Sequence, residues 1–230
     1  MPRTSEFPNS DNLAALVRYY RFHSRIYDAS RWLFLFGRSR LIQMLPTYCQ
    51  PNHILEVGCG TGKNLLHLHR IFPNASLAGL DLSPAMLDRA RTKMARQDHV
   101  PEFIQQAYDR PIAPDVPYDL LVFSYTLSMF NASWRQAIGS AYADLRPGGA
   151  VAVVDFHDSP VAVFKKWMAC NHVHMQGHLL PELRSGFHTR FCEIYPAYGG
   201  LWTYFRFIGE KVERPFSDVG SLISKTAGKT

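Results

Sequence analysis

The chain has 230 residues, of which 47% are hydrophobic and 19% are charged. This composition excludes a disordered or fibrous protein, and the length favours a single domain (1–230) over two enzyme-sized domains. The formal net charge of +6 permits an anionic partner.

Two further features of the sequence bear on its compartment. Residues 1–8 lack the apolar run of a secretory signal, and no apolar run reaches the roughly 18 residues of a membrane span. The four cysteines form no C-x-x-C pair, and we expect them to be reduced thiols. We therefore expect a cytoplasmic protein.

Residues 13–45 are rich in aromatic residues and contain six arginines against one acid, Asp28. Their apolar spacing predicts two or more short helices that break near Gly37. Two interpretations stay open. The segment is a helical lid with solvated arginines, or it lies on an anionic membrane with Trp32, Phe34 and Phe36 in the interface.

Strands and helices then alternate in a regular order. We expect strands at 53–57, 76–81, 102–107, 119–125 and 150–156, with helices at 63–72, 84–97 and 132–145. A strand pair at 191–195 and 202–208 follows. The near-continuous apolar strands predict an α/β fold with a doubly wound, mostly parallel sheet.

A glycine-rich loop, residues 56–62, joins the first strand to a helix. Lys63 stands where the third glycine of a dinucleotide fingerprint belongs, and Val57 and Asn64 break the phosphate-binding P-loop pattern. The remaining pattern is E-x-G-x-G-x-G. Its acid, Glu56, makes an anionic pocket that suits the cationic amino-acid end of S-adenosylmethionine (SAM).

Asp81 ends the next strand, 19 residues beyond Gly62, where a carboxylate can accept hydrogen bonds from both ribose hydroxyls. In this order the two motifs resemble the class I SAM-dependent methyltransferases over about residues 50–156. Residues 83–87 (S-P-A-M-L) and 145–149 (L-R-P-G-G) are similar to further motifs of that family.

The resemblance implies a seven-stranded, Rossmann-like sheet with an N-terminal helical lid at 13–45. The cofactor-binding core would span 50–156, and 157–230 would form the substrate side. Many family members carry Asp-Ala after the third strand; Gln106 replaces the acid here, and its carbonyl can accept the same bond from adenine. The implied cofactor contacts are Glu56, Gly58, Cys59, Gly60, Thr61, Gly62, Asn64, Asp81, Leu82, Met86, Gln106, Ala107 and Ser124.

Residues 18–38, 124–129 and 200–209 resemble the betaine-lipid N-methyltransferases, which methylate the amine of diacylglyceryl-homoserine. The resemblance predicts methyl transfer to an amine nitrogen, with peripheral association with an anionic membrane as one interpretation. Tyrosine faces can stabilise the growing ammonium, so Tyr27 and Tyr125 are the catalytic candidates, with Tyr20 and His157 as substrate contacts.

Other functions stay open beside the lipid enzyme. One is a soluble small-molecule N- or O-methyltransferase, and another is a catalytically idle SAM-binding module. We expect no nucleic-acid partner, because an N-P-P-Y-type tetrapeptide and a separate recognition domain are lacking. We also expect no metal, since the spacing of Cys170, His172, His174 and His178 matches no standard zinc site.

Overall fold

In a computed structural model of the protein, residues 35–113 and 116–212 are described. The helices are α2 (Arg38–Met44), α3 (Lys63–Ile71), α4 (Pro84–Met94), α5 (Trp134–Asp144), α6 (Ala162–Cys170) and α7 (Leu179–Gly186). The strands are β1 (His53–Val57), β2 (Ser76–Asp81), β3 (Glu102–Gln105), β4 (Tyr118–Ser124), β5 (Leu145–Phe156), β6 (His188–Ala197) and β7 (Trp202–Glu210). Short 3₁₀ helices are η1 (Leu45–Thr47), η2 (Leu127–Met129), η3 (Asn131–Ser133) and η4 (Tyr198–Gly200).

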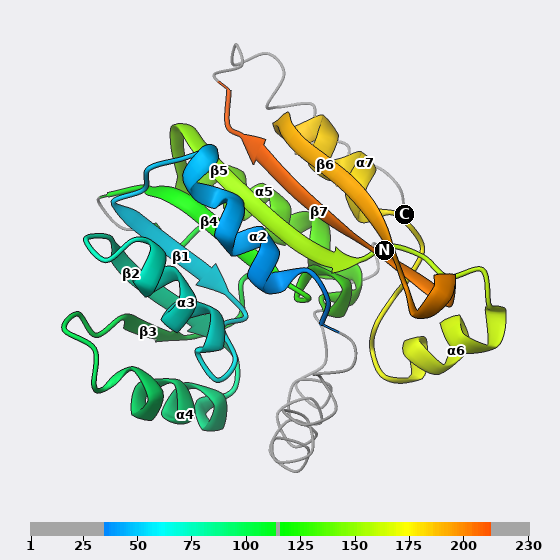
Figure 1. Cartoon of the computed structure of the whole chain (residues 1–230), viewed down its shortest axis with the longest axis horizontal. Helices are drawn as coiled ribbons and strands as arrows, with labels where there is room; N and C mark the ends of the chain where they lie inside the picture. Colours follow the sequence, from blue (N-terminus) through cyan, green and yellow to red (C-terminus); the bar gives the residue numbers. More distant parts are fainter. Residues whose placement is uncertain (1–34, 114–115, 213–230) are drawn as a thin grey trace, which may run out of the picture.

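The strands form one seven-stranded sheet in the order β3-β2-β1-β4-β5-β7-β6. The first five strands run parallel, β7 is antiparallel to β5, and β6 is antiparallel to β7. Helices lie on both sides of the twisted sheet (Figure 1). The predicted doubly wound, mostly parallel seven-stranded fold is confirmed.

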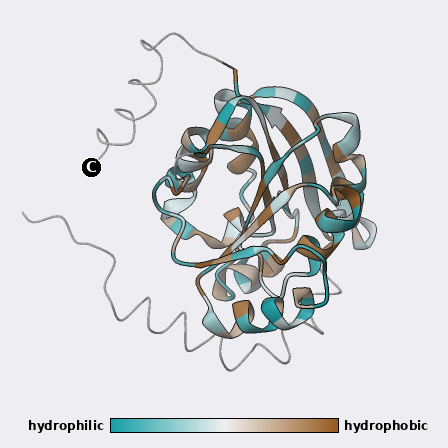
Figure 2. Ribbon diagram, turned by 90° about the vertical axis from the view of Figure 1, so that its left-hand side faces the viewer, coloured by the Kyte–Doolittle hydropathy of each residue, from teal (hydrophilic) through white to brown (hydrophobic). Residues whose placement is uncertain are grey.

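Successive side chains along each strand point to opposite faces of the sheet, so the hydrophobic core is divided between the two faces. Val151 and Val153 of β5 pack with α5 and α7, whereas Ala152 and Val154 pack on the face covered by α2. Figure 2 shows much of the hydrophobic colour on the interior strands and hydrophilic colour on the outer loops. The parallel strands are thus buried on both faces, as continuous apolar runs predict.

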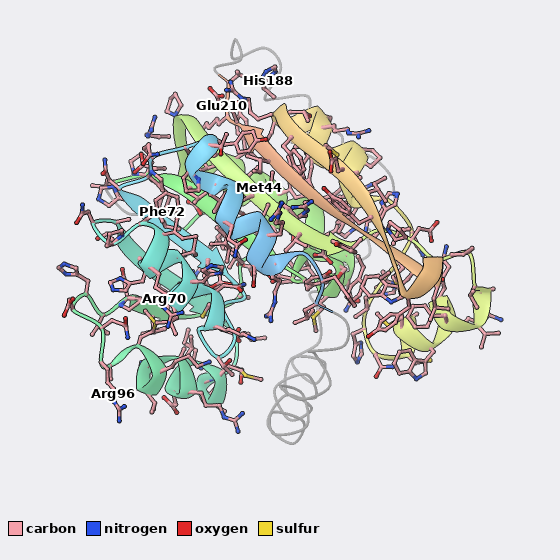
Figure 3. The ribbon with its side chains drawn as sticks, in the orientation of Figure 1. Met44, Arg70, Phe72, Arg96, His188 and Glu210 are labelled. Carbon is pink, nitrogen blue, oxygen red and sulfur yellow. The ribbon has the colours of Figure 1, made fainter. Side chains whose placement is uncertain are left out.

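Several predicted boundaries were wrong. The second core helix ends at Met94 and not near residue 97, and Arg96 points outward beyond it (Figure 3). β3 ends at Gln105, so residues 106 and 107 lie in the following loop. β5 already begins at Leu145, which pairs with Tyr118 before a register shift; residues 147–149 are therefore part of a strand and not a free turn.

The C-terminal third contains the predicted strand pair, and both strands are longer than expected. His188 and Glu210 face each other where β6 begins and β7 ends (Figure 3). Neither α6 nor α7 was predicted from the sequence pattern. None of the helices in the described part of the chain combines the length and the apolar character required to cross a bilayer.

Candidate active site

The glycine loop leaves the carboxyl end of β1, at the point where the strand order changes direction between β1 and β4 (Figure 1). Gly58, Gly60 and Gly62 all have positive φ, at 71°, 54° and 73°. A Cβ atom on Gly58 would lie 2.5 Å from Thr126 Cγ2, and one on Gly62 would lie 3.2 Å from the Ala90 backbone. The loop therefore requires glycine for both its conformation and its packing.

Glu56 is 1% exposed and lies one residue before the end of β1. Asn64, in the first turn of α3, donates a hydrogen bond from Nδ2 to Glu56 Oε1 at 2.8 Å. A buried carboxylate costs free energy unless it has partners, and this amide fixes its position. The pair places negative charge in the wall of the cleft, where a ligand's ammonium group can be bound.

Asp81, at the end of β2, connects the glycine loop to the start of α4. Its Oδ2 accepts the N–H of Gly60 at 2.8 Å, and its Oδ1 accepts the N–H of Ser83 at 2.9 Å. An ionised carboxylate has about four acceptor positions, so it retains capacity for ribose hydroxyls. The ribose contact stays a prediction, and the structure gives Asp81 a second task in holding the loop.

A cleft opens beside this loop. Among the predicted cofactor residues, its lining includes Glu56, Gly58, Cys59, Gly60, Thr61, Asn64 and Ser124. Gly62, Asp81, Leu82, Met86, Gln106 and Ala107 are not part of that lining. Met86 is buried on the packed side of α4. Cys59 does line the cleft, and burial raises the pKa of its thiol well above the usual range.

Four lining residues were not predicted from the sequence: Leu35, Arg38, Lys63 and Lys93. Lys93 Nζ donates to Thr61 Oγ1 at 3.2 Å across the mouth of the cleft. The three cations can attract a carboxylate while Glu56 attracts an ammonium group. SAM carries both groups in its amino-acid end, so the donor set fits this cofactor.

Tyr125 occupies a packing position. It is 1% exposed, its ring lies 4.7 Å from that of Phe156, and its hydroxyl donates to the Phe36 carbonyl at 2.8 Å. Burial raises the pKa of this phenol well above its ordinary value. The side chain does not line the described cleft, which gives no support to the predicted contact with the acceptor amine.

The other acceptor candidates are not brought together by the described structure. His157 is half-buried and packs beside Gly177 and Phe205, outside the cleft lining, and burial lowers its pKa. Tyr20 and Tyr27 lie outside the described residues, as do Trp32, Phe34 and most of the predicted lid.

The histidines of residues 170–178 have separate neighbours. His174 Nε2 lies 2.9 Å from Asn131 Oδ1, and the His178 ring lies 4.8 Å from that of Trp134. Within residues 35–113 and 116–212, no three His, Cys, Asp or Glu side chains gather into a group that could hold a metal ion.

Comparison with known proteins agrees with this geometry. Residues 54–149 match the family described as methyltransferase domain. The malonyl-[acyl-carrier protein] O-methyltransferase of Priestia megaterium is 31% identical over 147 residues, which cover 63% of this chain and 52% of that protein. The chain thus spans about half the length of the curated relatives it matches.

Two solved structures share the fold at 18% identity. The N-methyltransferase NodS of Bradyrhizobium japonicum, in complex with S-adenosylhomocysteine (SAH), has a TM-score of 0.64 over 76% of this chain and 86% of its own. The [4+2]-cyclase SpnF has a TM-score of 0.65 over 76% and 82%. Residues 54–149 thus match a methyltransferase domain, and the chain shares the fold of an N-methyltransferase whose structure contains SAH.

Proposed function

We propose that the protein transfers the methyl group of SAM to an amine nitrogen. The observation that carries this proposal is the cleft itself: a buried carboxylate, three cations and a glycine loop fixed by Asp81, all at the switch point of the sheet. The bound sulfonium supplies an activated methyl group.

The residues of this chain would act mainly by positioning. Glu56 and Asn64 would hold the amino-acid end of the cofactor, and Asp81 its ribose. In-line alignment of donor and acceptor then provides most of the rate enhancement. The acceptor amine must be neutral when it attacks, so the rate is expected to rise with pH toward the amine's own pKa, near 10 in water.

For the acceptor, we propose an amino-lipid head group similar to diacylglyceryl-homoserine. The sequence resemblance of residues 124–129 and 200–209 supports this choice. A surface feature supports it independently, because exposed apolar side chains extend from Phe36, beside the cleft residue Leu35, to α6. This apolar rim consists of Phe36, Val161, Val163, Trp167, Tyr198 and Leu201.

Contacts connect Phe36 to Tyr198 and the backbone of Leu201 to the segment before α6. The rings of Phe36 and Tyr198 are 5.4 Å apart. Ser159 Oγ donates to the Leu201 carbonyl at 2.6 Å and accepts the N–H of Val161 at 3.1 Å, immediately before α6. The rim thus extends from Phe36, between the cleft residues Leu35 and Arg38, to α6, which lies beyond the carboxyl end of β5 (Figure 1).

Helix α6 has the side chains of an interfacial surface. Val163 and Trp167 are 77% and 51% exposed and lie one turn apart, with Lys166 exposed between them. The helix contains no acidic residue. An exposed tryptophan beside the exposed Lys166 suits the boundary of an anionic bilayer, and we propose that the protein associates peripherally with such a membrane through this rim.

A soluble acceptor is the second candidate. The relatives and structural neighbours are named for O-methylation, N-methylation and cyclisation, so the same fold serves several acceptors. A small amine or hydroxyl compound would then replace the lipid.

Isotope-labelled methyl transfer tests these proposals. The purified chain is incubated with SAM bearing a trideuterated methyl group and with either vesicles containing diacylglyceryl-homoserine or free homoserine. Label in the vesicle lipid alone is the expected result in mass spectra. Label only in soluble amines would replace the lipid with the second candidate, and SAM binding without transfer to any amine would overturn the proposed activity.

A further inference from the structure

We infer that Tyr125 is a positioning residue that fastens residues 35–38 against the cofactor cleft. Its hydroxyl donates to the carbonyl of Phe36, 89 positions earlier in the chain, at 2.8 Å. On either side of that carbonyl, Leu35 and Arg38 line the cleft. The inference rests on the proposed cofactor site and assigns a task to a tyrosine that the cleft does not contain.

The backbone around Tyr125 is arranged for this contact. Ser124 lines the cleft, and Thr126 lies under Gly58 and donates from Oγ1 to the Val57 carbonyl at 3.2 Å. Between them, Tyr125 has φ 56°, a left-handed conformation that aromatic residues rarely adopt. This conformation turns the ring away from the cleft and into the core, beside Phe156.

The accepting carbonyl lies immediately before α2. The first carbonyl used within that helix is Gly37 O, which accepts the N–H of Leu41 at 2.8 Å. The Phe36 carbonyl precedes this bond and accepts the tyrosine hydroxyl. If the tyrosine hydroxyl is removed, this half-buried carbonyl is left without a donor. The cost in folding free energy then exceeds the net contribution of the hydrogen bond.

The outer side of the same turn is packed by rings. The Phe36 ring lies 5.4 Å from Tyr198 and 5.7 Å from Trp202, in edge-on geometry. Gly37 has φ 76°, and a Cβ atom there would lie 2.6 Å from Tyr204 Cε2. Rings therefore hold the turn from outside, and the Tyr125 hydroxyl holds its backbone from inside.

Tyr125→Phe removes only the hydroxyl and tests the fastening role. We expect SAH to bind about five- to tenfold more weakly, since one buried hydrogen bond is lost. We also expect a higher KM for SAM with little change in kcat at saturating SAM. Amides of residues 36–41 in the cofactor-free protein should exchange with deuterium faster than in the wild type.

Tyr142→Phe is the matched control. The Tyr142 hydroxyl also donates to a distant backbone carbonyl, that of Val212 at 2.9 Å, on α5 and away from the cleft. This variant should keep wild-type SAH affinity and wild-type exchange at residues 36–41. A general loss of stability would change both variants alike, whereas the proposed role changes only Tyr125→Phe.

The two readouts separate the possible failures. Wild-type amide exchange at residues 36–41 in Tyr125→Phe, or unchanged SAH affinity beside a wild type that binds SAH, overturns the fastening role alone. A wild-type protein that does not bind SAH overturns the proposed function, and with it any role of the turn in holding the cofactor.

Discussion

The Asp81 side chain holds the glycine loop and is expected to bind the ribose of the cofactor. Its replacement tests whether Asp81 belongs to the cofactor site or is an ordinary surface acid. Asp81→Ala removes the acceptors of the Gly60 and Ser83 N–H groups and the expected ribose contact. Hydrogen bonds to a charged group contribute roughly 1.5–3 kcal/mol, so the dissociation constant for SAH should rise about ten- to a hundredfold. Calorimetric titration measures it.

Asp88→Ala is the control for this experiment, because Asp88 lies exposed on α4 and pairs only with nearby Arg91 among the contacts described. It should leave the affinity unchanged. If Asp81→Ala binds SAH as tightly as Asp88→Ala, Asp81 has no part in the cofactor site.

The burial of Asp155 predicts that the folding stability of the protein depends on pH. The carboxyl group is fully buried at the end of β5, and burial raises its pKa to about 6 although the N–H groups of Ser128 and Phe156 partly offset this effect. The ordinary pKa of an aspartate, 3.8, applies to the unfolded chain. As pH rises from 3.8 to about 6, the unfolded state ionises first, so folding stability falls by up to about 3 kcal/mol and stays lower above that range.

Asp155→Asn cannot ionise and removes this contribution. Urea unfolding at several values between about pH 4 and pH 7 should show the variant gaining stability relative to the wild type as pH rises. The difference between the two proteins isolates Asp155 from the other titrating groups. Parallel stability curves would show that Asp155 ionises in the folded protein as readily as in the unfolded chain.

At the scale of elements, the loop between β1 and α3 depends on its fit against the end of β4. Gly58→Ala places a Cβ atom 2.5 Å from Thr126 and requires positive φ of an alanine. We expect a loss of at least about 1–3 kcal/mol of stability and weaker SAH binding. Unfolding curves and calorimetry report the two effects.

Gly139→Ala makes the same chemical change where space is open. Gly139 lies in α5, and apart from its chain neighbours and the backbone of its own helix no atom lies within 4 Å of an added Cβ. Alanine there should stabilise the helix by about 0.5–1 kcal/mol without changing SAH affinity. If Gly58→Ala is as stable as the wild type, the loop in solution differs from the one described.

The elements of the sheet core were predictable because each has its own local signal. Apolar runs bounded by glycine and proline gave β1, β2 and β4, and Ser83-Pro84 gave the start of α4. The missed α7 buries Leu179, Leu180 and Leu183 on one side, but Pro181 in its first turn obscured that pattern. The early start of β5 depends on pairing with Tyr118, which only the folded sheet supplies.

Apart from Ser124, the part of the candidate site that was predictable lies on one continuous motif. Most of the glycine-loop residues that were predicted to bind the cofactor line the cleft. Arg38 and Lys93 reach it from α2 and α4, which only folding brings together with Lys63. The orientation of the Tyr125 side chain depends on a positive φ, which cannot be predicted from the presence of a tyrosine in the sequence. Long-range packing and unusual backbone angles are thus what the sequence analysis lacked.

For the whole molecule, the proposed membrane contact predicts that α6 determines vesicle binding. Val163→Gln combined with Trp167→Gln removes two exposed apolar side chains of the rim without changing the charge. Co-sedimentation with phosphatidylserine-containing vesicles should fall sharply, and salt should weaken wild-type binding because Lys166 of α6 attracts the anionic surface. Activity toward a soluble amine should change little, since α6 does not line the cofactor cleft.

Val100→Gln combined with Val116→Gln is the matched control, because these valines are 59% and 53% exposed and precede β3 and β4, at the amino ends of the parallel strands, whereas α6 follows the carboxyl end of β5. This pair should sediment with vesicles as the wild type does. Equal loss in both double variants would mean that general surface hydrophobicity, and not the rim, determines binding. A wild-type protein that stays in the supernatant at low salt would contradict the membrane contact and favour the soluble acceptor.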